Sequence, residues 1–260
     1  MTEKLNTLGF DLNRARDIGR KYYGKQEEQE VEPTQEPQGE QTQQTVEPII
    51  PVIINPQNFV ASDYVSVPST NQDFAIGEIN KGLNYENAHL TTLNQGLAIP
   101  TPFEFMHFHN YILDCKKNNK PIYDSAGRQL SNSIKDDLYR QLTSDCWTWL
   151  NGAFYIKDKL KSIETVIGLD ARGKLLTKFT KLSPYLEENC LIDFLNLTSE
   201  GLPILKSSNQ TYTKGENIYY WKPVDGKVAG FIANSGRAGL YCSGNPSDSY
   251  DDLGVRAVRR

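Results

Sequence analysis

The C-terminal segment Val228–Arg260 constrains the fold more than any other part of the chain. It contains no Lys, Glu, Gln, Met or Trp, although these five types make up roughly a fifth of the whole sequence. Within it, Gly, Asn, Ser, Asp and Tyr crowd between an apolar start, Val228–Ile232, and an apolar finish, Leu253–Val258. Asn, Asp, Ser and Gly favour turns, and Tyr adds rigid, amphipathic contact area. The pattern predicts two buried strands that carry a long displayed loop, which is typical of a recognition surface.

Length and charge narrow the function classes. At 260 residues the chain can bury a sizeable core, and we expect one domain plus a tail. The formal net charge of -4 and the pI near 5.5 give no basic footprint for phosphate contacts, so we expect no nucleic-acid partner. The sequence shows neither a window of about 18 apolar residues nor an apolar signal region. We therefore expect no membrane insertion and synthesis in the cytoplasm without a signal peptide, which is compatible with later display on a virion surface.

Composition divides the chain into three parts. Residues 1–25 combine apolar and basic side chains and are interpreted as an amphipathic N-terminal tether, with a frayed terminus as the alternative. Residues 26–48 are rich in Gln, Glu and Pro and too polar to bury an apolar face, so we expect a disordered linker. The folded domain then spans 49–260. The apolar run 49–56 is predicted to be an edge strand, because Pro51 cannot donate to a ladder.

Two segments carry helical signals. A capping box at Thr101–Glu104 predicts a helix that begins there and ends near Lys116. Apolar residues at steps of four across Ile134–Leu142 predict a second helix that ends before Trp147.

Short segments rich in β-formers follow these helices. The run Trp149–Ile156 predicts a strand with a bulge near Gly152. Asp170–Gly173 lies between two such segments and predicts a hairpin connection. Shorter strands are expected within Leu191–Leu197 and Asn217–Trp221. Helices followed by many short strands indicate an α+β domain with antiparallel sheet.

The sequence contains no obvious set of catalytic or metal-ligating groups. His107 and His109 lie two residues apart on a predicted helix and point in different directions, so we interpret them as structural. Acidic neighbours oppose a reactive thiolate, as at Cys190, which follows Glu187 and Glu188. The cysteines are widely spaced and are expected to be reduced and mostly buried: Cys115, Cys146, Cys190 and Cys242. We expect no metal and no cofactor.

The tryptophans have two interpretations. Trp147, Trp149 and Trp221 are able to stack on sugars. Because Trp is largely buried in most proteins, we interpret all three as core residues.

The C-terminal segment resembles a known family. The stretch Gly230–Val258 is similar to the end of C-type lectin-type domains, particularly the formylglycine-generating-enzyme-like branch, whose signature runs R-G-G-S-W, an Asn-rich loop, then G-F-R-V. Here Ala229–Ile232 takes the place of the first element, Asn245–Pro246 falls in the loop, and Leu253–Arg256 takes the place of the last. Upstream, LAIPTPFEF and DCWTWLNGAFYI resemble segments of archaeal and archaeal-virus variable proteins from diversity-generating retroelements. That weaker similarity extends over most of residues 85–260.

The resemblance implies a fold and a source of diversity. The fold is C-type lectin-like, with two helices packed on short antiparallel sheets and a disordered N-terminal arm. In such retroelements, reverse transcription from a template repeat randomises adenines, so Asn codons of the AAY type scatter widely but cannot become Lys, Glu, Gln, Met or Trp. The composition of Val228–Arg260 is what this mechanism leaves behind, and a fixed strand pair without Lys is the alternative. The variable region is expected at about 215–260.

Carried over residue by residue, the resemblance assigns exposed variable positions that form a ligand-binding patch: Phe231, Ile232, Asn234, Ser235, Gly236, Tyr241, Ser243, Gly244, Asn245, Ser247, Ser249, Tyr250 and Asp251. It assigns the buried scaffold positions to the residues between them: Gly230, Ala233, Ala238, Gly239, Leu240, Leu253, Gly254, Val255 and Arg256. Formylglycine-generating enzymes need a paired cysteine arrangement, whereas this stretch offers only Cys242. We therefore expect no enzymatic activity.

The implied function is that of a ligand-binding display protein, whose diversified patch recognises an unknown protein or cell-surface partner such as a host component. One alternative is a viral structural or tail protein with a fixed contact loop. A second is a small enzyme of the same fold with Cys190 or Cys242 as nucleophile. The identity of the ligand and the oligomeric state do not follow from the sequence.

Overall fold

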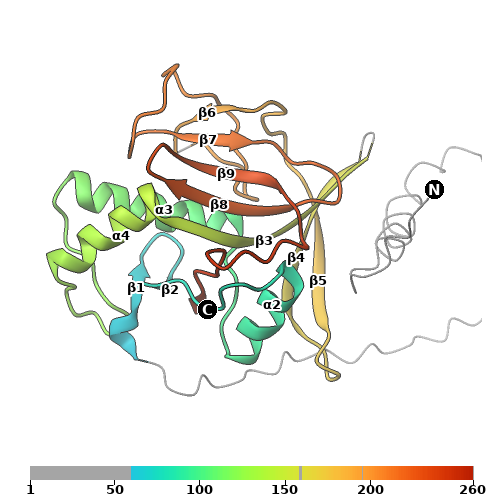
Figure 1. The fold of residues 1–260 in the computed structure, drawn as a ribbon, viewed down its shortest axis with the longest axis horizontal. Coiled ribbons are helices and arrows are strands. Elements are labelled where there is room, and N and C mark those ends of the chain that lie inside the picture. The colour runs from blue at the N-terminus through green and yellow to red at the C-terminus, as the bar shows by residue number, and fades with distance from the viewer. Residues whose placement is uncertain (1–59, 158–159, 195, 260) are drawn as a thin grey trace, which may run out of the picture. The chain divides into compact units, whose positions relative to one another are not determined.

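The computed structural model describes residues 60–157, 160–194 and 196–259. The chain divides into two compact units, Met1–Ile50 and Pro51–Arg260, and every described residue belongs to the second. Within these ranges the fold is α+β, with three α-helices and two sheets (Figure 1).

Three of the predicted N-terminal features lie outside the described residues. They are the tether at 1–25, the linker at 26–48 and the edge strand at 49–56. All three stay predictions.

The two predicted helices are confirmed, and both begin at side-chain caps. The Thr101 hydroxyl accepts from the Glu104 N–H at 3.2 Å, and the Glu104 carboxylate accepts from the Thr101 N–H at 2.7 Å, which completes the predicted capping box. The Ser131 hydroxyl caps the next helix by accepting from the Ile134 N–H. The helices of the described chain are α2 (Tyr85–Asn94), α3 (Pro102–Lys117) and α4 (Asn132–Ser144).

The sequence does not predict helix α2. Its N-cap is Asn84, whose side-chain oxygen accepts from the Asn87 N–H at 2.9 Å. The helix buries Tyr85 and His89 among mostly polar neighbours, so it has no continuous apolar stripe for a periodicity argument to detect. The cap residue is the signal that marks its start.

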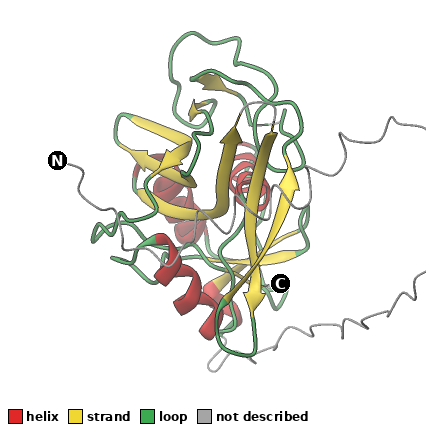
Figure 2. Ribbon diagram, turned by 90° about the vertical axis from the view of Figure 1, so that its right-hand side faces the viewer, coloured by secondary structure: helices red, strands yellow, loops and turns green. Residues whose placement is uncertain are grey.

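Seven strands form the central sheet, whose twist is visible in Figure 2. All neighbours are antiparallel except β7 and β9, so the predicted antiparallel sheet is confirmed for every pair but this one, and the sheet is mixed. The chain reverses its direction at the turn 222–227 and again at the turn 235–236. Strand β9 lies between β8 and β7 in the sheet and therefore runs parallel to β7. In spatial order the strands are β5 (Leu175–Lys181), β4 (Leu160–Leu169), β3 (Cys146–Lys157), β8 (Val228–Asn234), β9 (Arg237–Gly244), β7 (Ile218–Trp221) and β6 (Cys190–Ile192).

A second, three-stranded sheet joins the start of the described chain to its end. A 3-10 turn at Ala61–Asp63 precedes its first strand. Val258 lies opposite Phe74, so the last strand pairs with the second. The strands are β1 (Tyr64–Val67), β2 (Gln72–Ala75) and β10 (Val258–Arg259), in the order β1-β2-β10.

The predicted strand and hairpin after α4 are confirmed. Strand β3 begins at Cys146, three residues earlier than expected, and its register against β8 shifts between Trp149 and Ala153, where a bulge is predicted. Strands β4 and β5 are joined by the predicted turn at Asp170–Gly173. Gly173 there has φ 73°, which favours glycine.

The prediction of one long loop between two buried strands is wrong, because strand β9 occupies its middle. Inward-facing Ala238 and Leu240 alternate with outward-facing residues, a period of two that supports a half-buried strand. The Asn234 side-chain oxygen accepts from the Arg237 N–H at 3.1 Å and closes a hairpin between β8 and β9. The displayed loop is therefore confined to 245–252.

Helices α3 and α4 pack on the inner face of the central strands, beside β3 and β8 in Figure 1. Phe231 of β8 is fully buried there, with its ring centroid 5.0 Å from Phe105 and 4.9 Å from His109, both on α3. His109 also lies 5.0 Å from the ring of Phe194. This aromatic contact fixes the central hairpin to the helical layer.

Arg256 joins the small sheet to helix α4. Its guanidinium is fully buried and donates to the Ala75 carbonyl at 3.0 Å, to the Ile76 carbonyl, and to the Gln141 side-chain oxygen at 2.5 Å. Its backbone N–H donates to the Thr148 hydroxyl at 2.9 Å. Both terminal nitrogens of the guanidinium are thus satisfied, while its Nε is buried without a hydrogen-bond partner among the described residues. The scaffold role expected for Arg256 is consistent with these contacts, because they offset part of the cost of burying a cation.

The burial of His109 makes stability depend on pH. Burial, assisted by the positive charge of Arg256 and opposed by the hydrogen bond to the Leu142 carbonyl, lowers the pKa of His109 to about 4. One ring nitrogen donates to that carbonyl at 3.3 Å, so the neutral ring fits the site. In the unfolded chain an ordinary histidine pKa applies, near 6.5.

We predict that acidification from pH 7 to pH 4 destabilises the domain through His109. The unfolded chain binds the proton below about pH 6.5 and the folded chain only below the lowered pKa, so stability is complete above this window and is lost as pH falls through it. The loss expected from this group is about 3 kcal/mol. Denaturant titrations of the wild type and of His109→Gln measure it. Equal pH dependence in both proteins contradicts the assignment.

Candidate functional site

The outer face of the central sheet carries the candidate site. On β8 and β9, residues such as Phe231 and Leu240 point to the helices, whereas Ile232 and Tyr241 lie on the opposite face. The helices α3 and α4 cover the inner face only. The outer face is therefore the side on which side chains of these strands are free to meet a partner.

Register places aromatic residues from three strands side by side on this face. Trp147 of β3 lies opposite Ile232, and Tyr241 of β9 lies opposite Trp221 of β7. Tyr219, also on β7, lies opposite Gly239. The result is a continuous aromatic surface across β3, β8, β9 and β7, which we call the aromatic face.

Two glycines allow the rings to lie flat on the sheet. A Cβ at Gly230 would lie 2.4 Å from Cζ of Tyr241, and a Cβ at Gly239 would lie 2.4 Å from Cζ3 of Trp221. Real Cβ atoms do not approach other atoms this closely, so only glycine leaves room for each ring. The rings of Tyr241 and Trp221 therefore lie directly over the backbone at these two glycines.

Further contacts hold the rings in place. The Trp147 indole N–H donates to the Tyr241 hydroxyl at 2.9 Å. Tyr250, from the loop after β9, stacks on Trp147 with centroids 4.9 Å apart and an interplanar angle of 22°. The Arg237 guanidinium lies over Trp221, 5.4 Å from the ring centroid. The side chains are thus fixed before any ligand arrives, which lowers the entropy lost on binding.

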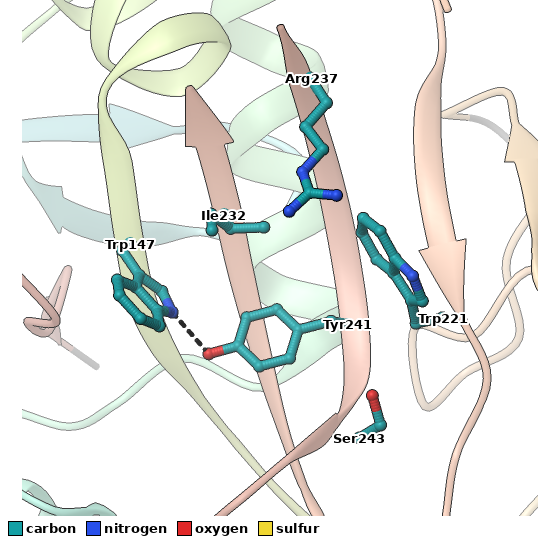
Figure 3. Close-up of a pocket in the computed structure, with 6 residues that line it drawn as sticks. All are labelled: Trp147, Trp221, Ile232, Arg237, Tyr241 and Ser243. Atoms are coloured by element: carbon teal, nitrogen blue, oxygen red, sulfur yellow. Dashed lines mark hydrogen bonds between the residues drawn. The ribbon is translucent and has the colours of Figure 1, made fainter. Parts of the chain in front are cut away.

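A shallow pocket of about 220 Å³ opens over the Tyr241 ring (Figure 3). Figure 3 shows the ring between the two tryptophans, with the guanidinium of Arg237 on one side and Ser243 on the other. Six residues line it: Trp147, Trp221, Ile232, Arg237, Tyr241 and Ser243. This volume suits one side chain or one small planar group.

The polar groups of the pocket offer mainly hydrogen-bond donors, and the Ser243 hydroxyl can donate or accept. Arg237 can only donate, and the described residues provide its guanidinium with no hydrogen bond or ion pair. The Tyr241 hydroxyl accepts from Trp147, which leaves its own proton for a ligand. Burial raises the pKa of Tyr241, so this proton stays bound at neutral pH. The pocket is therefore suited to a ligand that presents oxygen acceptors beside an apolar surface.

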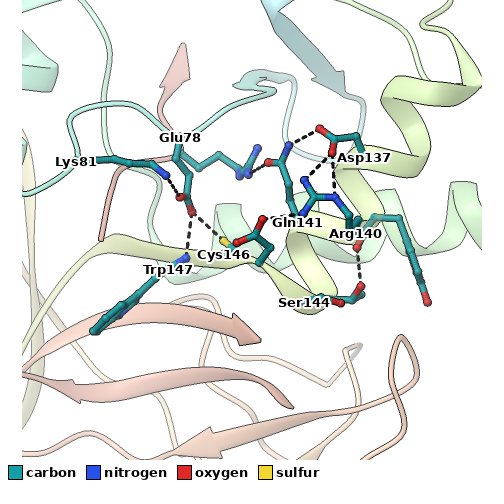
Figure 4. Close-up of polar contacts among 12 residues, drawn as sticks. Glu78, Lys81, Asp137, Arg140, Gln141, Ser144, Cys146 and Trp147 are labelled. Atoms are coloured by element: carbon teal, nitrogen blue, oxygen red, sulfur yellow. Dashed lines mark hydrogen bonds and ion pairs between the residues drawn. The ribbon is translucent and has the colours of Figure 1, made fainter. Parts of the chain in front are cut away.

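Glu78 holds the start of β3, and with it Trp147. Its carboxylate, largely buried, accepts from the Trp147 backbone N–H at 3.2 Å and from the Cys146 thiol at 3.1 Å (Figure 4). Lys81 lies 3.5 Å from the same carboxylate. Near this carboxylate, the Gln141 side-chain NH2 donates to Asp137, and the Gln141 oxygen accepts from Arg256. These bonds tie helix α4 to Arg256.

The structure corrects two of the proposed patch positions. Phe231 is fully buried against α3, and the prediction that it is exposed is wrong, because it faces the helices in the alternation of β8. Gly244 is also buried: an added Cβ would lie 2.8 Å from the Tyr241 ring and 3.0 Å from the Val228 carbonyl. A larger residue at Gly244 would displace the ring that forms the pocket floor.

The other proposed positions lie at the surface. Ile232 and Tyr241 are half-buried and line the pocket. Tyr250 is 51% exposed and reaches the pocket wall through Trp147. The remaining positions are exposed, at the β8–β9 turn, at the end of β9 or in the following loop: Asn234, Ser235, Gly236, Ser243, Asn245, Ser247, Ser249 and Asp251.

Sequence reasoning misses three residues of the site. Trp147 and Trp221 are interpreted there as core, but both are half-buried on the aromatic face, and only Trp149 is fully buried. Arg237 is assigned no role. Strict period-two alternation from Arg237 through Tyr241 is the signal that places it on the outer face.

The cysteines and histidines do not form a reactive centre in the described part of the chain. No group of three or more His, Cys, Asp or Glu side chains there is arranged to hold a metal ion. Burial raises the pKa of Cys242, and burial together with the Glu188 charge raises that of Cys190. Both thiols are therefore protonated and weakly nucleophilic at neutral pH, which disfavours the alternative of a cysteine enzyme.

Comparisons add no identification. No family model, no curated protein and no solved structure matches the chain. Among the described helices, none is both long and apolar enough to span a membrane.

We predict that Gly239→Ala disrupts the aromatic face. The new Cβ would meet Cζ3 of Trp221 at 2.4 Å and the Tyr219 carbonyl oxygen, which is backbone and cannot move aside, at 2.8 Å. The expected loss is about 1–3 kcal/mol in unfolding free energy, with a change in tryptophan fluorescence. Gly236→Ala is the matched control, since nothing lies closer than 3.8 Å to its Cβ. Equal losses of unfolding free energy in the two variants would contradict the claim that only glycine at position 239 leaves room for the Trp221 ring.

Proposed function

We propose that this chain is a ligand-binding display protein without enzymatic activity. Its aromatic face and the adjoining loop 245–252 form the recognition surface, and a retroelement diversifies the C-terminal part of that surface. The observed architecture is α+β. We propose more specifically that the scaffold has a C-type lectin-like fold. The partner is a protein or cell-surface component, such as one displayed by a host.

The observation that carries the proposal is the separation of buried and exposed positions in one short segment. Every position assigned to the scaffold is buried, including the run Leu253–Arg256. Of the thirteen positions assigned to the patch, Phe231 and Gly244 are removed, which leaves eleven at the surface. A paratope needs this separation, because side chains can change at a surface whose backbone is fixed by buried neighbours.

The nature of the surface also supports recognition. Trp, Tyr and Arg dominate the energetic centres of protein interfaces, and all three meet in the pocket over Tyr241. Trp147 lies far upstream of the variable region and Trp221 is a type that adenine randomisation of AAY codons cannot produce. In this proposal they are constant anchors, and the eleven changing positions around them supply specificity.

We predict that patch residues tolerate substitutions that scaffold residues do not. Ser249→Tyr and Tyr250→Asn both change exposed side chains. Ser249→Tyr is expected to shift the unfolding free energy by about 0.5 kcal/mol or less. Tyr250→Asn is expected to lower it by about 1 kcal/mol, because the stacking of Tyr250 on Trp147 is lost. Leu253→Ala empties a fully buried site and is expected to cost about 2–5 kcal/mol. Thermal and urea denaturation of the three variants measure this. Losses of similar size at the patch and at Leu253 contradict the display proposal.

The genetic part of the proposal has its own test. Sequencing of the DNA beside the gene is expected to find a near-copy of the codons for residues 215–260, with adenines at the eleven positions, next to a reverse transcriptase gene. Sister isolates should differ mainly at those positions. A missing repeat, together with identical patches in all isolates, would instead indicate the alternative of a structural protein with a fixed contact loop.

A further inference from the structure

The pocket over Tyr241 combines an apolar floor with an unpaired positive charge. The floor is the face of the Tyr241 ring, with Ile232 beside it and a tryptophan on either side. The Arg237 guanidinium rests on Trp221 and, within the described residues, meets no carboxylate. A guanidinium that rests on a ring keeps its planar edge open to a pair of anionic oxygens.

The lining residues also indicate what the pocket does not suit. Arg237 donates, the Tyr241 hydroxyl has its proton left to donate, and the Ser243 hydroxyl can donate or accept. Among the described residues, no Asp, Glu, Asn or Gln lines the pocket. A neutral sugar presents hydroxyls that need acceptors as well as donors, and this set lacks strong acceptors. A second positive charge is disfavoured by Arg237 itself. A carboxylate beside a flat apolar group matches both parts of the pocket.

The surrounding charges place the anion at one end. Asp248, in the loop that follows the end of β9, acts on the Tyr241 hydroxyl and raises the pKa of that group, after burial and against the Trp147 hydrogen bond. Arg237 begins β9, at the opposite end of the strand. The carboxylate is therefore favoured on the Arg237 side, and the apolar group on the Tyr241 ring.

We propose that this pocket binds one aromatic side chain of a protein partner, while an adjacent acidic side chain of that partner pairs with the exposed Arg237 at the pocket's edge. The partner's carboxylate pairs with Arg237, and its aromatic ring stacks on Tyr241 between Trp147 and Trp221. This inference rests on the proposed function, because it names the chemistry that the pocket selects within the recognition surface. Trp147, Trp221 and Arg237 lie outside the eleven changing positions, whereas Ile232, Tyr241 and Ser243 are among them. Changes at those positions and around the pocket then decide which acidic and aromatic pair is accepted.

Two capped dipeptides test this directly on the full-length chain: acetyl-glutamyl-phenylalanine amide and acetyl-glutaminyl-phenylalanine amide. They differ only in the charge of one side chain. Tryptophan fluorescence and NMR chemical shifts are expected to show millimolar binding of the acidic peptide and about threefold to tenfold weaker binding of the neutral one. Added salt should reduce this difference.

Arg237→Gln removes the charge at an exposed position and is expected to abolish the preference without changing the melting temperature by more than a few degrees. Arg172→Gln, an exposed arginine in the turn between β4 and β5, is the matched control and should keep the preference. Equal binding of both peptides to the wild type, or a preference that survives Arg237→Gln, overturns the inference. So does binding of methyl glucuronide in place of the peptides, which would indicate an acidic sugar.

The inference about the ligand and the proposed function can fail independently of each other. If patch substitutions are tolerated and the template repeat is present, but the charge preference is missing, only the ligand inference fails. If the preference is present but the patch is intolerant and the isolates are identical, the pocket is a fixed contact site, and diversification is what fails.

Discussion

The β8–β9 hairpin meets the helical core on one face and solvent on the other, and every part of the site depends on that division. Phe231 packs against Phe105 and His109 on α3, which holds the hairpin in register with the layer behind it. Since side chains alternate along a strand, fixing the inward residues also fixes where Ile232 and Tyr241 point. A one-residue slip would bring the aromatic face into the core and expose the core residues.

The aromatic face also depends on the close packing of aromatic rings against the backbone of the sheet. Gly230 and Gly239 leave space for Tyr241 and Trp221 to lie flat, so the rings present their faces rather than their edges. The hydrogen bond from Trp147 to Tyr241 and the stacking of Tyr250 add links from β3 and from the loop after β9. The site is therefore built from segments far apart in sequence, and a rigid surface of this kind binds with little ordering cost.

The sequence predicts local features better than their combination. The capping box before α3 and the turn before β5 follow from a few adjacent residues, and both are confirmed. The insertion of β9 between β7 and β8 depends on long-range pairing, which composition does not reveal; turn-forming residues make β9 look like loop. The same limit explains why Trp147 and Trp221 are interpreted as core residues from the sequence. Their exposure depends on which strands lie beside them and on the glycines beneath the rings of this face.

The central claim is that one face of this hairpin is fixed by packing while the other is interchangeable. A scan of all single substitutions across residues 228–258, read out as protease resistance of the folded chain, tests it most directly. We expect intolerance to alternate along β8 and β9, to be high at inward residues and at Gly230 and Gly239, and to fall to near zero across the loop 245–252. Intolerance spread evenly over both faces and the loop would contradict it.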